Sequence, residues 1–184
     1  IWAPEHLAAS LALMANENAD MTAHNEWLSI DGSETLNDSI SRLGERASPF
    51  LALYCKGCLS TSTIVVTRKA VHAKGGFDPT LANGQDVDLW LAILADDSIR
   101  LATSPQPLGW YLVRPGSINS HISRRLRFFT MIAGRWAGTV LRKPGGEISL
   151  IWFRIAAIHY EAMRSHVANK AFGPFLAAAL RFPL

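Results

Sequence analysis

Hydrophobic and polar residues are spaced in two different ways along the chain, and the spacing changes near His121. Before this residue, β-branched runs and prolines separate short stretches with helical spacing. After it, apolar residues recur every three to four positions over long segments. The first part is therefore predicted to be α/β, with a few mixed strands, and residues 120–182 are predicted to be nearly all helical.

The pattern of the first part predicts individual elements. Helical spacing favours helices over residues 4–16, 35–46 and 68–74, and from residue 86 onward. β-branched or alternating runs favour strands over residues 20–30, 59–67, 99–103 and 108–113. Ser48-Pro49 is predicted to end a helix, and Pro105 and Pro107 are predicted to separate the last two strands.

The second part predicts three helices separated by two breaks. The helices cover residues 124–140 and 147–169 and an alanine-rich stretch that ends at Arg181. The breaks fall at residues 143–146 and at Gly173-Pro174.

Composition places the chain among globular proteins. Its 184 residues are 49% hydrophobic and 18% charged, which excludes a disordered chain. No apolar run approaches the ~18 residues that would span a bilayer. Ile1 to Pro4 lack the basic start and apolar core of a signal peptide, and Met is absent from the first position. We expect a cytoplasmic protein, present here as a piece of a longer chain.

Cysteines and histidines do not predict a metal centre. Cys55 and Cys58 form one Cys-x-x-Cys without the second pair of ligands that a structural zinc site needs. We expect them to be two reduced cysteines in a loop or at a strand edge. The six histidines show no ligand spacing, so we assign no metal ligand in this chain.

Charge is distributed unevenly between the two parts. Residues 1–97 hold six Lys and Arg against thirteen Asp and Glu, whereas residues 98–184 hold twelve against two. Residues 124–143 carry six cations and no acid, together with three aromatic residues, Phe128, Phe129 and Trp136. This segment is either a solvated face packed on the first part or a helix that binds an anionic membrane surface. No nucleic-acid-binding module accompanies the charge, so we expect no nucleic acid.

The segment from Gly75 to Trp90 is the strongest candidate for chemistry. Gly75-Gly76-Phe77-Asp78-Pro79 predicts an irregular loop, and a second loop ends at Gly84. Helical spacing after Gly84 places Asp86 and Asp88 in the first turn of a helix, where the helix dipole favours ionised carboxylates. Two interpretations of Asp86 remain open: a general base and a residue that caps the helix.

The order of these pieces resembles the acceptor side of family 2 glycosyltransferases, which have the GT-A fold. Gly-Gly-Phe-Asp followed by Gly-Gln-Asp-Val-Asp-Leu-Trp-Leu is similar to a motif pair of that family. The lead-in over residues 62–71, the closing strand over 107–111 and the loop over 114–118 resemble the segments around it. Residues 1–7 are similar to the continuation of the family's Asp-x-Asp motif. The resemblance covers residues 1 to 120.

This resemblance implies a partial GT-A domain. Residues 1–118 would form its acceptor-side half, with a mixed sheet, and residues 119–184 a C-terminal helical extension. The chain would begin just after the Asp-x-Asp motif, so the nucleotide-binding half and most ligands of a divalent metal, Mn²⁺ or Mg²⁺, would lie outside it. The implied activity is transfer of a sugar from a nucleotide-sugar donor to a glycan or lipid-linked acceptor, at the inner face of the membrane.

The resemblance also implies roles for particular residues. Asp86 would be the general base, and the residues implied in substrate binding are Gly75, Gly76, Phe77, Gln85, Asp88, Trp90 and Arg114. Gln85 stands where the family usually has Glu, and Arg114 where it often has His. Two interpretations of Arg114 stay open: it pairs with a diphosphate oxygen, or it is a solvated loop residue. The alternative is a truncated or degenerate GT-A domain that acts as a non-catalytic binding or scaffold module.

Overall fold

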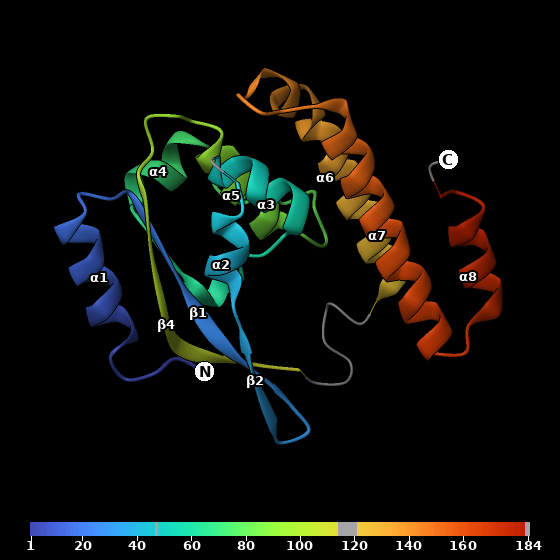
Figure 1. The fold of residues 1–184 in the computed structure, drawn as a ribbon, viewed down its shortest axis with the longest axis horizontal. Coiled ribbons are helices and arrows are strands. Elements are labelled where there is room, and N and C mark those ends of the chain that lie inside the picture. The colour runs from blue at the N-terminus through green and yellow to red at the C-terminus, as the bar shows by residue number, and fades with distance from the viewer. Residues whose placement is uncertain (47, 114–120, 183–184) are drawn as a thin grey trace. The chain divides into compact units, whose positions relative to one another are not determined.

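A computed structural model describes residues 1–46, 48–113 and 121–182 (Figure 1). The chain forms two compact units. The first unit comprises Ile1–Asp78 and Asp86–Pro115, and the second comprises Pro79–Gln85 and Gly116–Leu184. The short segment Pro79–Gln85 therefore belongs with the C-terminal helices, although it lies within the part of the sequence that forms the first unit.

The first unit contains a four-stranded mixed sheet built around β1 (Met21–Ile30). β4 (Leu101–Leu112) runs parallel to β1. β3 (Ile64–Val66) pairs antiparallel with the first residues of β1, and β2 (Ser33–Asn37) pairs antiparallel with the last ones. The predicted α/β class with a mixed sheet is confirmed at this level.

The predicted helix over residues 35–46 is wrong in its first part. Residues 33–37 form β2, and only Ser39–Gly44 form a helix, α2. The cause is the turn Asp31-Gly32, in which both residues have positive φ, 48° and 83°. A two-residue turn of this kind returns the chain as a hairpin, so Ser33 pairs with Ile30. Asp38 then caps α2 by accepting a hydrogen bond from the backbone N–H of Ser41.

Ser48-Pro49 starts a helix, contrary to the prediction that it ends one. The helix is α3 (Pro49–Lys56), with Ser48 as the N-cap and Pro49 in the first turn. Proline fits there because the first-turn N–H groups have no partner within the helix. Cys55 lies inside α3, so its predicted loop or strand-edge position is also wrong. Both cysteines are buried and free of a disulfide, as expected for reduced thiols.

The strand boundaries also differ from prediction. Within residues 59–67, only β3 is paired as a strand. Thr61–Thr63 form a 3₁₀ turn, η1. The two strands predicted over 99–103 and 108–113 form the single strand β4. Its register with β1 shifts around Asn25, which pairs with Pro107, so the prolines produce an irregularity without ending the strand.

Helices cover both sides of this sheet. Figure 1 shows α1 (His6–Asn16) on one side of β1 and β4, with α2, α3 and α5 (Gln85–Leu94) on the other. α4 (Arg68–Ala73) leads into the loop before α5. The core of the first unit is formed largely by α3 and α5, which bury six and seven side chains.

The second unit contains three helices, α6 (Ile122–Arg142), α7 (Ile148–Ala168) and α8 (Phe172–Ala179). α7 packs against both of the others. The break predicted at Gly173-Pro174 is wrong, because both residues lie in the first turn of α8, where proline is tolerated. Among the described residues, no helix is long and apolar enough to cross a membrane.

The segment Pro79–Gln85 packs against α6 at Gly84. A Cβ at this glycine would lie 2.8 Å from Ile132 Cδ1 and 3.1 Å from Phe129 Cε2, and its φ is +75°. Any other residue would therefore meet both a steric clash and an unfavourable backbone conformation. The predicted turn at Gly84 is confirmed, and it is packed within the second unit.

Candidate functional site

Asp86 lies in the first turn of α5, as the sequence predicts, and its carboxylate is held at two points. Oδ2 accepts a hydrogen bond of 2.6 Å from Thr61 Oγ1, and Oδ1 accepts one of 2.8 Å from the backbone N–H of Val87. The second bond satisfies a first-turn donor, so Asp86 does contribute to capping. A carboxylate offers about four acceptor positions. The half-buried side chain therefore keeps acceptor capacity for a third group.

An aromatic pair joins α5 to the loop before it: Trp90 lies one turn after Asp86, and Phe77 lies in that loop. Trp90 follows Asp86 at the i+4 position, and its ring meets that of Phe77 edge to face, with centroids 6.0 Å apart. Trp90 is only 3% exposed, whereas Phe77 is 50% exposed. Phe77 is therefore the member of this pair that a bound molecule can reach, and Trp90 supports it from the core.

The other residues implied in binding lie around this face or outside the described structure. Gly75 and Gly76 precede Phe77 with φ of +79° and +77°, and a Cβ at either would meet no atom within 4 Å. Gln85 is the half-buried first residue of α5, and Asp88 is buried two residues after Asp86. Arg114 lies outside the described residues.

A buried carboxylate, Glu26, was missed by the sequence analysis. It is 1% exposed and accepts hydrogen bonds from three neutral side chains. These are Ser60 Oγ at 2.5 Å and Asn37 Nδ2 at 3.0 Å on Oε1, and Ser62 Oγ at 2.9 Å on Oε2. Ser60 and Ser62 flank Thr61, so Glu26 fixes the turn that holds Asp86.

The same turn is also contacted by a group of three rings, of which His6 and His24 are buried and Trp2 is exposed. Trp2 Nε1 donates to the backbone oxygen of Ser62 at 2.9 Å, and the Trp2 ring stacks on His6 at 4.6 Å between centroids. His6 meets His24 edge to face, at 4.5 Å. His24 Nδ1 lies 2.7 Å from the carbonyl oxygen of Asn25 and must carry the proton, because a carbonyl can only accept. Burial lowers the pKa of both histidines.

Mild acid is therefore expected to destabilise the first unit. In the unfolded chain His6 and His24 take up protons near pH 6.5, whereas their lowered pKa in the folded protein delays protonation. Below about pH 6.5 the unfolded chain binds more protons, so the free energy of unfolding falls, by at most about 1.4 kcal/mol per pH unit for each histidine. Urea unfolding between neutral pH and about pH 5 measures this slope.

The substitution His24→Gln should make that dependence on pH shallower, because it removes one of the two titrating groups. His121→Gln is the matched control, since His121 is exposed. Equal pH dependence in the wild type and in His24→Gln would contradict the assignment.

Within the described ranges, no cluster of three or more His, Cys, Asp or Glu side chains could hold a metal ion.

In the basic segment 124–143, Arg125 pairs with Glu161 at 2.6 Å, and Lys143 is only 9% exposed. Phe128, Phe129 and Trp136 are half-buried. The exposed charge of this segment is therefore smaller than the sequence count suggests.

Comparison of the chain with models of protein families, with curated proteins and with solved structures gave no match. The interpretation of the site therefore depends on its own geometry and on the motif order described above.

Proposed function

We propose that the first unit is the acceptor-binding half of a GT-A-type glycosyltransferase, with Asp86 as the general base. The observation that carries the proposal is the position of Asp86, a half-buried carboxylate in the first turn of α5 that is oriented by Thr61. Trp90 follows one turn later on α5, and its ring contacts that of Phe77 in the loop before the helix. A carboxylate that removes a proton must be fixed within hydrogen-bond reach of the reacting hydroxyl. The bond from Thr61 supplies that fixation.

In this proposal an acceptor sugar lies over the exposed ring of Phe77, and one of its hydroxyls points toward Asp86. Asp86 takes the proton of this hydroxyl while the hydroxyl oxygen bonds to the anomeric carbon of the donor sugar. The bond from that carbon to the nucleoside diphosphate breaks, and the diphosphate leaves. Most ligands of a divalent metal, Mn²⁺ or Mg²⁺, would lie outside this chain, and so would most contacts to the diphosphate apart from that of Arg114. The metal would stabilise the charge of the leaving group.

The alternative is a binding or scaffold module without catalysis. Gln85 favours it, because the family that this segment resembles usually has Glu at that position. Both alternatives use the exposed Phe77 to hold a glycan, and only the first needs the carboxylate of Asp86.

Two binding measurements on this chain test the proposal. Saturation-transfer NMR with a panel of oligosaccharides should detect an acceptor, and Phe77→Ala should weaken its binding about three- to tenfold, because aromatic contacts contribute about 0.5–1.5 kcal/mol. Leu36→Ala is the matched control, since Leu36 is similarly exposed on β2. Calorimetry with UDP- and GDP-sugars plus Mn²⁺ should show weak or no binding. Micromolar donor binding, or no oligosaccharide binding, would contradict the assignment to the acceptor side.

We also propose that exposed arginines of α6 bind an anionic membrane surface. Arg124 and Arg142 are exposed, and no acid occurs among residues 124–143. Co-sedimentation of the protein with anionic vesicles should decrease in the double variant Arg124→Gln/Arg142→Gln, and also with rising salt, because exposed charges are screened within ~10 Å at 0.1 M. The variant Lys56→Gln/Lys69→Gln makes the same charge change in the first unit and should bind as the wild type does. Equal binding to neutral vesicles would contradict the electrostatic mechanism.

A further inference from the structure

The helices of the second unit line a cavity of about 540 Å³ that is open to solvent on one side. Each helix lines it with residues from one face. α6 contributes Ser123, Leu126, Arg127 and Thr130, and α7 contributes His159 and His166. From α8 and the residues after it come Pro174, Ala177, Ala178 and Arg181. Five of these side chains, those of Ser123, Arg127, Pro174, Ala177 and Arg181, are exposed, and the others are half-buried or buried, so the cavity runs from the surface to the packed faces of the helices.

Positions at which packed helices face one another normally carry apolar side chains that fill the core. Here six of the ten are Ser, Thr, Arg or His, and none is acidic. A helical bundle whose facing residues are polar and leave space between them has the construction of a ligand site. The volume lies within the range of about 300–1,000 Å³ that is typical of small-molecule pockets.

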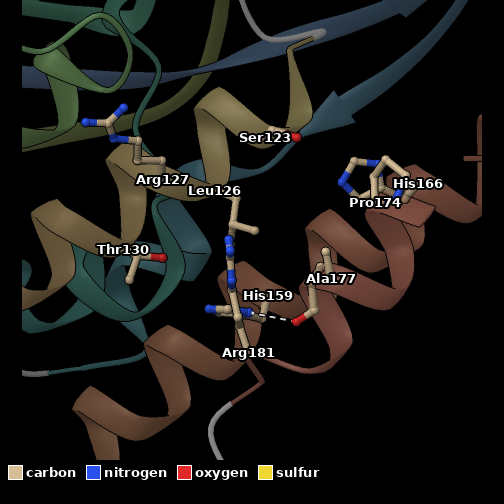
Figure 2. A pocket seen from close by; sticks show the side chains of 10 residues that line it. Ser123, Leu126, Arg127, Thr130, His159, His166, Pro174, Ala177 and Arg181 are labelled. Carbon is tan, nitrogen blue, oxygen red and sulfur yellow. Dashed lines mark hydrogen bonds between the residues drawn. The ribbon is translucent and has the colours of Figure 1, made fainter. Parts of the chain in front are cut away.

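The polar groups that face the cavity are mainly hydrogen-bond donors. Figure 2 shows Arg181 extending from the end of α8 across the cavity beside His159, with Arg127 at its outer edge. The described residues give neither arginine an ion pair with a carboxylate. Thr130 Oγ1 is buried without a hydrogen-bond partner among them. A buried hydroxyl without a partner is costly, and a ligand oxygen would relieve that cost.

The remaining wall of the cavity consists of apolar side chains and of the two histidines. Leu126, Pro174, Ala177 and Ala178 give an aliphatic surface. His159 is 6% exposed, and its Nδ1 lies 3.3 Å from the carbonyl oxygen of Ala178, which fixes the ring against α8. His166 is 5% exposed and lines the end of the cavity beside Pro174 in Figure 2. One part of the cavity therefore suits a negative charge and another suits a short hydrocarbon chain.

We propose that this cavity binds an alkyl phosphate: a phosphate group at Arg181, with its aliphatic chain along the alanine-rich face of α8. The guanidinium group of Arg181 and the hydroxyls of Ser123 and Thr130 offer more donors than the two oxygens of a carboxylate can use. A phosphate has more acceptor oxygens and matches the planar fork of arginine. The site is independent of the role assigned to Asp86.

Calorimetry on the whole chain with propyl, butyl and hexyl phosphate tests the proposal. Affinity should rise by about fourfold for each added methylene that enters the cavity, because a buried CH₂ contributes about 0.8 kcal/mol. Inorganic phosphate should bind much more weakly than hexyl phosphate, hexanoate should be intermediate, and hexanol should not bind measurably. Equal binding of phosphate and hexyl phosphate would overturn the proposal, and so would no binding of hexyl phosphate at millimolar concentration.

Two variants locate the site by independent means. Arg181→Gln removes the charge that reaches into the cavity and should weaken hexyl phosphate about tenfold or more, since hydrogen bonds to charged groups contribute about 1.5–3 kcal/mol. Ala177→Phe fills space next to α8 without a change in charge, and it should shorten the alkyl chain that the cavity accepts. Arg164→Gln is the matched control, because Arg164 is exposed on α7 and does not line the cavity. If Arg181→Gln and Ala177→Phe both bind as the wild type does while folded, the proposal is wrong.

The same chemistry occurs in free alkyl phosphates and in lipid headgroups. Vesicles that contain phosphatidic acid distinguish these sources when soluble hexyl phosphate is added as a competitor. Release of wild-type protein but not of Arg181→Gln from the vesicles would identify a lipid phosphate. Binding of hexyl phosphate without such competition would identify a soluble ligand. Either result supports the site.

Discussion

Replacing Asp86 by Asn should lower the rate of sugar transfer on the order of 10²- to 10⁴-fold in a protein that contains both halves of the domain. The amide keeps the size of the side chain and can still bond to Thr61 and to the backbone N–H of Val87. It cannot accept the proton of an attacking hydroxyl. Because the loss affects the transition state, kcat should fall much more than donor affinity.

Thr61→Val is the companion variant. It removes only the hydrogen bond that orients Asp86, so the fall in kcat should be smaller, about tenfold, with the carboxylate still present. Release of nucleoside diphosphate, coupled to a spectroscopic assay, measures both variants. Near wild-type turnover in Asp86→Asn, together with a lowered melting temperature in Asp86→Ala, would show that Asp86 only stabilises the start of α5.

Replacing Glu26 by Ala should lower the free energy of unfolding by about 2–4 kcal/mol. Three half-buried donors, on Asn37, Ser60 and Ser62, would lose their acceptor, and each buried group left unsatisfied costs about 1–3 kcal/mol before the structure relaxes. Glu34→Ala on β2 is the matched control, because Glu34 is exposed and should change stability by no more than about 0.5 kcal/mol. Urea unfolding followed by tryptophan fluorescence gives both values.

Glu26→Gln separates stability from function. The amide retains one acceptor oxygen but presents an N–H₂ where one of the serine hydroxyls now donates. A protein that stays folded but turns over more slowly would show that Glu26 positions Thr61 and, through it, Asp86. If Glu26→Ala is as stable as Glu34→Ala, the buried network does not hold the turn.

The features predicted correctly from the sequence are those that local spacing determines. The apolar positions at 87, 90, 91 and 94 placed Asp86 and Asp88 in the first turn of a helix, and the structure confirms this placement. The long helices α6 and α7 also follow directly from their spacing. In each case the residues that decide the structure lie within a few positions of one another.

The features that were missed depend on capping, turn geometry or distant partners. The sequence analysis predicts that Pro49 ends a helix. In the structure it begins one, because Ser48 before it is a preferred N-cap. The prediction of a strand over residues 20–30 followed by a helix over residues 35–46 contains no hairpin, although Asp31-Gly32 forms one between β1 and β2. Glu26 bonds to Ser60 and Ser62, which lie 34 and 36 residues further along the chain, and no local periodicity encodes that contact.

The path of the chain through Gly84 has a consequence for the order in which the protein can be made. The segment Pro79–Gln85 belongs to the second unit, and Gly84 fits against Phe129 and Ile132 of α6. The ribosome releases α6 only after the whole of β4. During synthesis the residues immediately before Asp86 therefore lack α6, their packing partner, until the rest of the first unit has emerged from the ribosome. A chain cut just after the sheet would keep Asp86 but lose the surface on which the preceding segment packs.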